Sequence, residues 1–145
     1  MILGNDAATR AAGAALAPLL RAGDIVTLNG PLGIGKTTFV RGLLAALGHA
    51  GEVPSPSFAI VQPYDLPEMP VWHVDLYRIN DPSELDELGL DSILDEGALL
   101  VEWPGNAGEG AFPGALALTL EAAQRGARRL TARVPAAWEG RWPPR

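Results

Sequence analysis

A glycine-rich pattern at residues 30–37, Gly-Pro-Leu-Gly-Ile-Gly-Lys-Thr, constrains the fold of this chain more than any other feature. A β-rich run, 24–29, precedes it, and a strongly helical run, 37–47, follows it and stops at Gly48. Glycines let the backbone turn tightly with its N–H groups pointing inward, and the N-terminus of the following helix adds positive potential. Strand, loop and helix in this order form the context that a phosphate-binding loop requires. We therefore predict a site for a nucleoside triphosphate.

The side chains of this pattern have separate expected roles. Lys36 is expected to reach the β- and γ-phosphates as a point charge and to count among the catalytic residues, and the Thr37 hydroxyl is expected to ligate Mg²⁺. The Asn-Lys-x-Asp pattern that reads guanine is absent from the sequence, which favours ATP over GTP. The predicted nucleotide contacts in this region are Gly33, Ile34, Gly35, Lys36, Thr37 and Thr38.

The order of the other expected elements indicates the fold class. Alternating helices and strands followed by a late strand pair predict an α/β P-loop NTPase fold, a three-layer sandwich with a mostly parallel sheet and antiparallel edge strands. Residues 1–135 are expected to form a single domain, and 136–145, rich in glycine and proline, a loose C-terminal tail. The expected helices are 7–17, capped by Asn5 or Asp6, and 81 to about 88; the expected strands are 58–61, 71–74, 97–102, 115–120 and 128–134.

Two acidic residues end predicted strands. Glu102 closes the continuous apolar run 98–101, and Asp75 closes 71–74. In an open parallel sheet, ligands lie beyond the carboxyl ends of the strands, so both acids are expected to face the phosphates. We predict that one carboxylate holds the magnesium shell and that the other orients the attacking water or senses the γ-phosphate. His73, on the same predicted strand as Asp75, is interpreted as a packed or hydrogen-bonded histidine rather than a catalytic base.

Composition narrows the classes of partner. The net charge is −6 and Lys36 is the only lysine, so the chain is a poor candidate for binding tRNA or DNA alone, although it could join a complex whose other members do so. The apolar runs are shorter than the roughly 20 residues of a membrane span, so no membrane association is expected. Cysteine is absent and the N-terminus lacks a basic, apolar leader, which favours a cytoplasmic protein.

Four motifs in a fixed order resemble the bacterial TsaE (YjeE) family of small ATPases, which serve in making threonylcarbamoyladenosine on tRNA. The resemblance extends from about residue 5 to residue 134. The combination of the glycine-rich pattern with Asp-Leu-Tyr-Arg and Glu-Trp-Pro is far more specific than the glycine-rich pattern alone. The motifs are Asn-Gly-Pro-Leu-Gly-Ile-Gly-Lys-Thr-Thr at 29–38, Ser-Pro-Ser-Phe at 55–58, His-Val-Asp-Leu-Tyr-Arg at 73–78 and Val-Glu-Trp-Pro at 101–104.

The resemblance implies a role for individual positions. Thr37 and Glu102 match magnesium ligands, and Asp75 matches an acid thought important for hydrolysis. Thr9 and Gly126 match nucleotide contacts, although this chain has Gly126-Ala127-Arg128 where the family often has Gly-Arg, so the arginine is not carried over. The positions implied for the switch or the partner surface are Ser55, Ser57, Tyr77, Arg78 and Trp103.

The resemblance also implies a cellular role. The family acts on the TsaB–TsaD heterodimer, which with TsaC or TsaC2 carries out the transfer that yields the modified adenosine 37 in tRNAs reading codons that begin with adenine. Under this reading the chain is a slow, Mg²⁺-dependent, partner-stimulated ATPase and not itself the carbamoyltransferase.

Two other functions remain open from the sequence. A P-loop small-molecule kinase shares the loop and helix, although no insertion with clustered arginines occurs before residue 125. A nucleotide-gated binding module is the non-enzymatic alternative. The acidic residues between 81 and 96 are either a solvated face or a docking patch for a basic partner.

Overall fold

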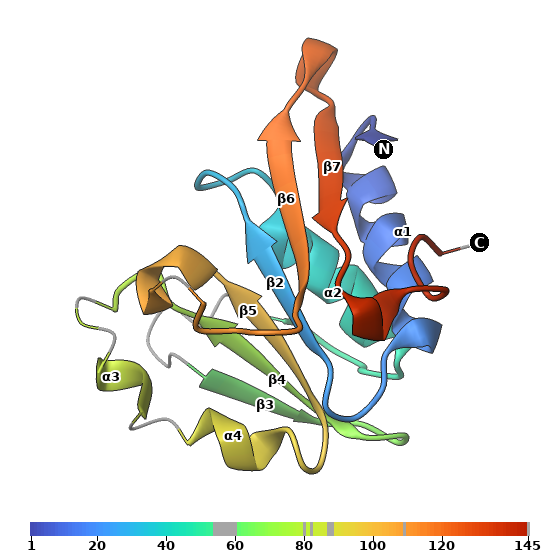
Figure 1. The fold of residues 1–145 in the computed structure, drawn as a ribbon. Helices are drawn as coiled ribbons and strands as arrows, with labels where there is room; N and C mark the ends of the chain where they lie inside the picture. The colour runs from blue at the N-terminus through green and yellow to red at the C-terminus, as the bar shows by residue number, and fades with distance from the viewer. Residues whose placement is uncertain (54–60, 80, 82, 87–88, 109, 145) are drawn as a thin grey trace.

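A seven-stranded β-sheet forms the centre of the computed structural model, which describes residues 1–53, 61–79, 81, 83–86, 89–108 and 110–144 (Figure 1). The strand order is β1-β7-β6-β2-β5-β4-β3. The strands are β1 Ile2–Leu3, β2 Ile25–Asn29, β3 Val61–Asp65, β4 Pro70–Asp75, β5 Ala98–Glu102, β6 Leu116–Ala122 and β7 Arg128–Arg133.

The four central strands, β6, β2, β5 and β4, run parallel to one another. The edges are antiparallel, because β7 pairs with β6, β1 with β7, and β3 with β4. Every residue of β5 is buried, as the continuous apolar run of its sequence indicated. The predicted α/β fold class, with a mostly parallel centre and antiparallel edges, is confirmed.

Helices α1 (Asp6–Leu16) and α2 (Lys36–Ala46) lie side by side on one face of the sheet (Figure 1). In the part of the chain that the structure describes, the other face carries the short helices α3 (Ser83–Asp86) and α4 (Leu90–Ile93), the short turn Pro104–Ala107 and loops, so this outer layer is thin. Asn5 is the cap of α1, because its side-chain oxygen accepts a hydrogen bond of 2.8 Å from the Ala8 N–H. None of the helices in the described ranges is long and apolar enough to traverse a bilayer.

Two glycines allow α1 and α2 to approach each other closely. A Cβ atom added to Gly13 would lie 2.0 Å from the carbonyl oxygen of Phe39, and one added to Gly42 would lie 1.9 Å from that of Arg10. The helices thus meet backbone to backbone at two points. This contact fixes α2, and with it the loop from which α2 starts, against α1.

The β3 region differs from the sequence prediction. Residues 58–60 of the predicted strand lie outside the described residues. Its last residue, Val61, begins β3, and β3 continues to Asp65 through residues 62–65, which were expected to be loop. Strand β3 contains Pro63, whose backbone nitrogen carries no hydrogen and so cannot donate a hydrogen bond to a neighbouring strand. Because β3 is an edge strand with β4 as its neighbour, the proline is tolerated there.

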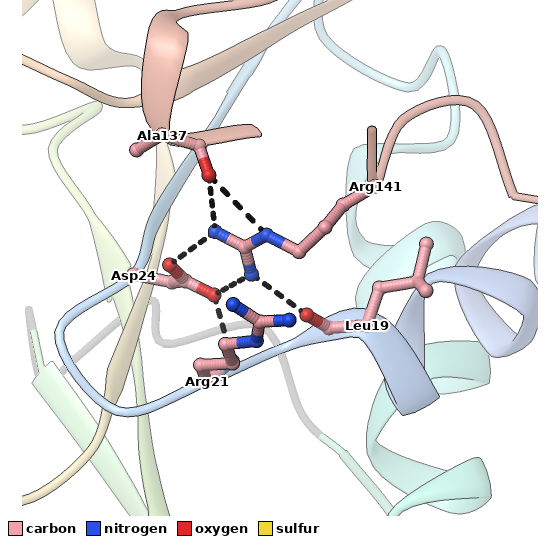
Figure 2. A network of polar contacts seen from close by, with 5 residues as sticks. All are labelled: Leu19, Arg21, Asp24, Ala137 and Arg141. Carbon is pink, nitrogen blue, oxygen red and sulfur yellow. Dashed lines mark hydrogen bonds and ion pairs between the residues drawn. The ribbon is translucent and has the colours of Figure 1, made fainter. Parts of the chain in front are cut away.

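The described part of the C-terminal segment, residues 136–144, is packed against the domain and is not the loose tail that its glycines and prolines predicted. Trp138 is completely buried in the core on the α1 and α2 side of the sheet. Arg141 crosses to the start of β2, where its guanidinium donates to both carboxylate oxygens of Asp24 and to the carbonyl oxygen of Leu19 (Figure 2). Burial of a large aromatic side chain and a two-point ion pair outweigh the local preference for irregular chain.

Candidate nucleotide-binding site

The glycine loop, residues 30–35, connects the carboxyl end of β2 to the N-terminus of α2. Gly35 occupies the N-cap of α2 with a φ of 117°, a conformation that L side chains rarely adopt. The loop therefore enters the helix directly, without a capping side chain, and leaves the first N–H groups of α2 directed at the loop. This arrangement provides the positive helix terminus that an anion-binding site needs.

Lys36 folds back over the glycine loop. Its Nζ donates to the carbonyl oxygen of Gly30, lies 3.4 Å from that of Pro31, and is 3.7 Å from the ring centroid of Trp103. Burial lowers the pKa of this lysine, while the carboxylates of Glu102 and Asp75 act in the opposite direction. The Lys36 Nζ is thus held against the glycine loop, where the charges of both predicted acids act on it.

Glu102 joins α2 to the end of β5 and to β4. The Thr37 hydroxyl lies 3.1 and 3.3 Å from the two carboxylate oxygens of Glu102, although 65 positions separate the residues. On the other side, His73 Nε2 lies 2.6 Å from Oε2 of Glu102. Both His73 and Glu102 are buried. The pair predicted to hold magnesium is therefore adjacent, with a histidine as a further neighbour.

Asp75 stands beside Glu102 at the same edge of the sheet, because the two residues pair in register between β4 and β5. Its Oδ1 accepts a hydrogen bond of 2.9 Å from the Tyr77 N–H. Burial raises the pKa of Asp75; the Tyr77 N–H opposes this shift, and the charge of Glu102 adds to it. The carboxyl of Asp75 is thus half-buried at the predicted phosphate end of the sheet, next to a second acid.

The turns after β4 and β5 are tied to each other. The Asn106 side-chain amide donates to the carbonyl oxygens of Leu76, at 2.9 Å, and Tyr77, at 3.3 Å. The rings of Tyr77 and Trp103 pack with centroids 4.9 Å apart, and Trp103 itself adopts a left-handed φ of 59°. Tyr77 remains 50% exposed, and Arg78 is exposed beside it.

The start of α1 and the β6–β7 turn flank the glycine loop. Thr9 is buried, and its methyl group would lie 3.5 Å from a Cβ placed on Gly35. Arg128 donates through Nε to the carbonyl oxygen of Ile34, at 2.6 Å, and through Nη1 to that of Gly126, at 2.7 Å. Gly126 is therefore connected to the glycine loop through an arginine.

Two residues that contact the site were not assigned to it from the sequence. His73 was interpreted as a packed or hydrogen-bonded histidine, without Glu102 as its partner, and the arginine of Gly126-Ala127-Arg128 was not carried over. The signal was present for both, in a histidine two positions before a strand-end acid and an arginine close to a turn glycine. The predicted switch residues Ser55 and Ser57 lie outside the described residues, and Thr38 lies half-buried on α2.

The donor set suits a magnesium ion held together with phosphates. Mg²⁺ is usually bound by one or two carboxylates plus substrate phosphates and waters rather than by an all-protein cage. Thr37 supplies a hydroxyl at the start of α2, Glu102 a carboxylate at the end of β5, and Asp75 a second carboxyl beside Glu102 at the end of β4. No cluster of three or more His, Asp or Glu residues with metal-binding geometry occurs in the part of the chain that the structure describes.

Relatives of known family share both the sequence and the fold of this chain. The TsaE protein of Haemophilus influenzae is 42% identical over 90 residues, which cover 61% of this chain and 56% of the relative. That of Streptomyces coelicolor is 47% identical over 97 residues, 65% of this chain and 66% of the relative. Both carry the name tRNA threonylcarbamoyladenosine biosynthesis protein TsaE. The matched part thus spans less than two thirds of each relative.

The crystal structure of YdiB from Bacillus subtilis is similar to the whole fold. It superposes with a TM-score of 0.79 at 31% identity, covering 94% of this chain and 85% of YdiB. The family model described as threonylcarbamoyl adenosine biosynthesis protein TsaE matches residues 3–130, which include the glycine loop, both strand-end acids and the β6–β7 turn. This chain belongs to the TsaE family.

Proposed function

We propose that this protein binds and hydrolyses ATP·Mg²⁺ as a component of the machinery that makes threonylcarbamoyladenosine at adenosine 37 of tRNAs reading codons that begin with adenine. It acts on the TsaB–TsaD heterodimer, which with TsaC or TsaC2 performs the transfer. The observation that carries the proposal is the contact of Thr37 with Glu102, at 3.1 Å, at the start of the helix that follows the glycine loop. Family membership supplies the pathway.

The residues around this contact have distinct roles in the proposal. The N–H groups of the glycine loop and Lys36 bind the β- and γ-phosphates. Thr37 and Glu102 would hold Mg²⁺, which neutralises charge on the phosphate oxygens when it is bound. Thr9 lies against Gly35 and supports the loop from the α1 side.

Hydrolysis itself requires a water that attacks the γ-phosphorus while the bond to the bridging oxygen of ADP breaks. Asp75 is the residue that we propose to orient this water, because its carboxyl lies beside Glu102 at the end of the parallel strands. The raised pKa of Asp75 makes its carboxylate a better proton acceptor, as a residue that orients an attacking water requires. Slow hydrolysis is expected from this chain alone, with stimulation when a partner orders the site.

The partner surface is proposed to surround the same site. Tyr77 and Leu32 are large side chains that remain 50% and 73% exposed, at the β4 turn and on the glycine loop. Tyr77 packs on Trp103, whose ring in turn contacts Lys36. A change at the phosphates therefore has a short route to exposed aromatic surface, as a nucleotide-driven switch requires.

The test is phosphate release by the purified full chain with Mg²⁺ and ATP, with and without TsaB and TsaD, combined with capture of the TsaB–TsaD pair with and without ATP. Stimulated phosphate release and ATP-dependent capture support the proposal. Rapid transfer of phosphate to a metabolite would instead indicate a small-molecule kinase. ATP-dependent capture that survives the loss of hydrolysis in Asp75→Ala would indicate a nucleotide-gated binding module.

A further inference from the structure

The imidazole of His73 is completely buried on β4 and contacts the carboxylate of Glu102 on β5. We propose that His73 is a positioning residue that fixes the Glu102 carboxylate through a hydrogen bond from Nε2 and thereby sets the strength of the magnesium site. This inference rests on the proposed function for the metal, whereas the hydrogen bond itself does not.

The two ring nitrogens of His73 have different surroundings. Nε2 lies 2.6 Å from a carboxylate oxygen of Glu102, within hydrogen-bond distance. Nδ1 is buried and meets no hydrogen-bond partner among the residues that the structure describes. An N–H group orphaned in the interior is costlier than an orphaned lone pair, so the proton belongs on Nε2 and not on Nδ1. Nε2 is then the donor of this hydrogen bond and Glu102 is the acceptor.

Strand register explains how the histidine reaches the acid. His73 pairs with Leu100, and Asp75 pairs with Glu102, so His73 and Glu102 lie two positions apart along neighbouring parallel strands. Side chains at alternate positions share a face of the sheet, which places His73 on the same face as Glu102. Both side chains are held by the surrounding core, with accessibilities of 0% and 4%.

His73 is the contact of Glu102 that does not itself belong to the proposed metal ligands. Among the described residues, the other side-chain hydrogen bond to this carboxylate comes from the Thr37 hydroxyl, which is itself a proposed ligand of the ion. Carboxylates that bind metals are generally hydrogen-bonded by a second residue, and removal of that residue costs about 10–100-fold in metal affinity or activity. A histidine that served packing alone would need no contact with the carboxylate.

The first experiment separates metal binding from nucleotide binding. Mn²⁺ is titrated into the full chain with ADP and its binding is followed by electron paramagnetic resonance, while ADP affinity is measured separately in EDTA. His73→Met, which lacks the donor, is expected to weaken Mn²⁺ binding about 10–100-fold with little change in the EDTA measurement. His73→Gln, which places an amide N–H at a similar reach, is expected to restore most of the affinity.

Val74→Ala is the matched control, because Val74 is equally buried on β4 but packs in the cluster on the opposite face of the sheet. It is expected to lower stability without moving Mn²⁺ affinity. An equal loss of Mn²⁺ affinity in Val74→Ala and His73→Met, or equal losses with and without metal in His73→Met, would overturn the positioning role.

The second experiment uses the unmodified chain without nucleotide. Long-range ¹H–¹⁵N spectra of the histidines are expected to show His73 with a proton on Nε2 and none on Nδ1. A protonated Nδ1 would overturn the assignment. Failure of the unmodified chain to bind Mn²⁺ with ADP would refute the proposed function and the metal role together, and the spectra would still decide the hydrogen bond. The two failures are therefore distinguishable.

Discussion

Arg141 and Asp24 form a two-point ion pair across 117 positions of the sequence, with guanidinium-to-carboxylate distances of 2.8 and 3.0 Å (Figure 2). Asp24 Oδ2 also accepts a hydrogen bond of 2.7 Å from the backbone N–H of Arg21. The guanidinium stacks over the buried ring of Trp138, 3.9 Å from its centroid. The pair thus fastens the segment after β7 to the residue that immediately precedes β2, the strand leading into the glycine loop.

We expect Arg141→Met to destabilise the protein strongly. The side chains of the pair are only 11% and 10% exposed, and removing one partner of a buried pair typically costs about 3 kcal/mol because the other charge is left uncompensated. The free energy of unfolding from urea titration measures this loss. The double variant Arg141→Met, Asp24→Asn should lose less than the sum of the single changes. Glu139→Gln, on the exposed surface of the same segment, serves as the control, and a loss in it as large as in Arg141→Met would contradict the prediction.

Gly42→Ala is expected to destabilise the protein even though alanine is the better helix former. The added methyl group would lie 1.9 Å from the Arg10 carbonyl oxygen, a backbone atom that cannot move aside without shifting α1. Helix propensity favours alanine by about 0.5–1 kcal/mol, whereas overpacking of this kind costs about 1–3 kcal/mol or more. Urea unfolding should show a net loss. Gly4→Ala, with nothing within 4 Å, should be nearly neutral, and a gain in stability for Gly42→Ala would refute the close contact.

The parts of the fold that could be predicted are those that depend on the sequence of a short, continuous segment. The glycine loop lies between β2 and α2 as expected, and Glu102 ends a strand buried along its whole length. Reliance on local pattern also explains why the C-terminal segment was expected to be loose. The segment around Trp138 contains glycines and prolines, which disfavour helices and strands. Its local sequence does not indicate that the Trp138 ring packs into a core formed by elements distant in the sequence. Irregular chain can be well packed without being regular.

Contacts between distant residues set the second limit of prediction. The contact of His73 with Glu102 depends on β4 being the neighbour of β5, and that of Arg128 with Ile34 depends on the β6–β7 turn reaching the glycine loop. Neither sheet neighbour is fixed by spacing in the sequence. The sequence shows which residue types are present, but the partner of each residue can be identified only once the order of the strands in the sheet is known.

Asp75→Asn is expected to stabilise the protein at neutral pH while impairing ATP hydrolysis. Burial raises the pKa of Asp75 above its ordinary value of 3.8, so the folded state binds this proton more tightly than the unfolded state. Stability from this group is therefore greatest below pH 3.8 and is lost as the pH rises through the folded-state pKa. The asparagine variant removes that loss, so its advantage in urea unfolding should vanish at low pH. An asparagine variant less stable than the parent at pH 7 would contradict this sign.

Glu102→Gln tests the proposed metal ligand. The amide keeps the size of the side chain but removes the charge that Mg²⁺ and Lys36 face, so we expect Mg²⁺-dependent turnover to fall about 100-fold. Nucleotide affinity in EDTA should change little, because the glycine loop is untouched. Equal losses with and without metal would count against the metal role. Glu84→Gln, an acidic residue on α3, provides the control and should leave both measurements unchanged.

Lys36→Met separates binding of the triphosphate from stability of the fold. The ammonium group sits at the mouth of the glycine loop, and its loss should lower ATP turnover about 10²–10³-fold, with a marked loss of ATP affinity, because a charge is removed from the β- and γ-phosphate site. Burial lowers the pKa of Lys36, which means that the folded state disfavours the charged form relative to water. The methionine variant, which keeps the apolar stem, should therefore unfold at a urea concentration no lower than the parent. Isothermal titration with ATP and urea unfolding measure the two effects. Unchanged ATP affinity and turnover in a folded variant would remove Lys36 from the site, whereas joint loss of folding and binding would make its role structural.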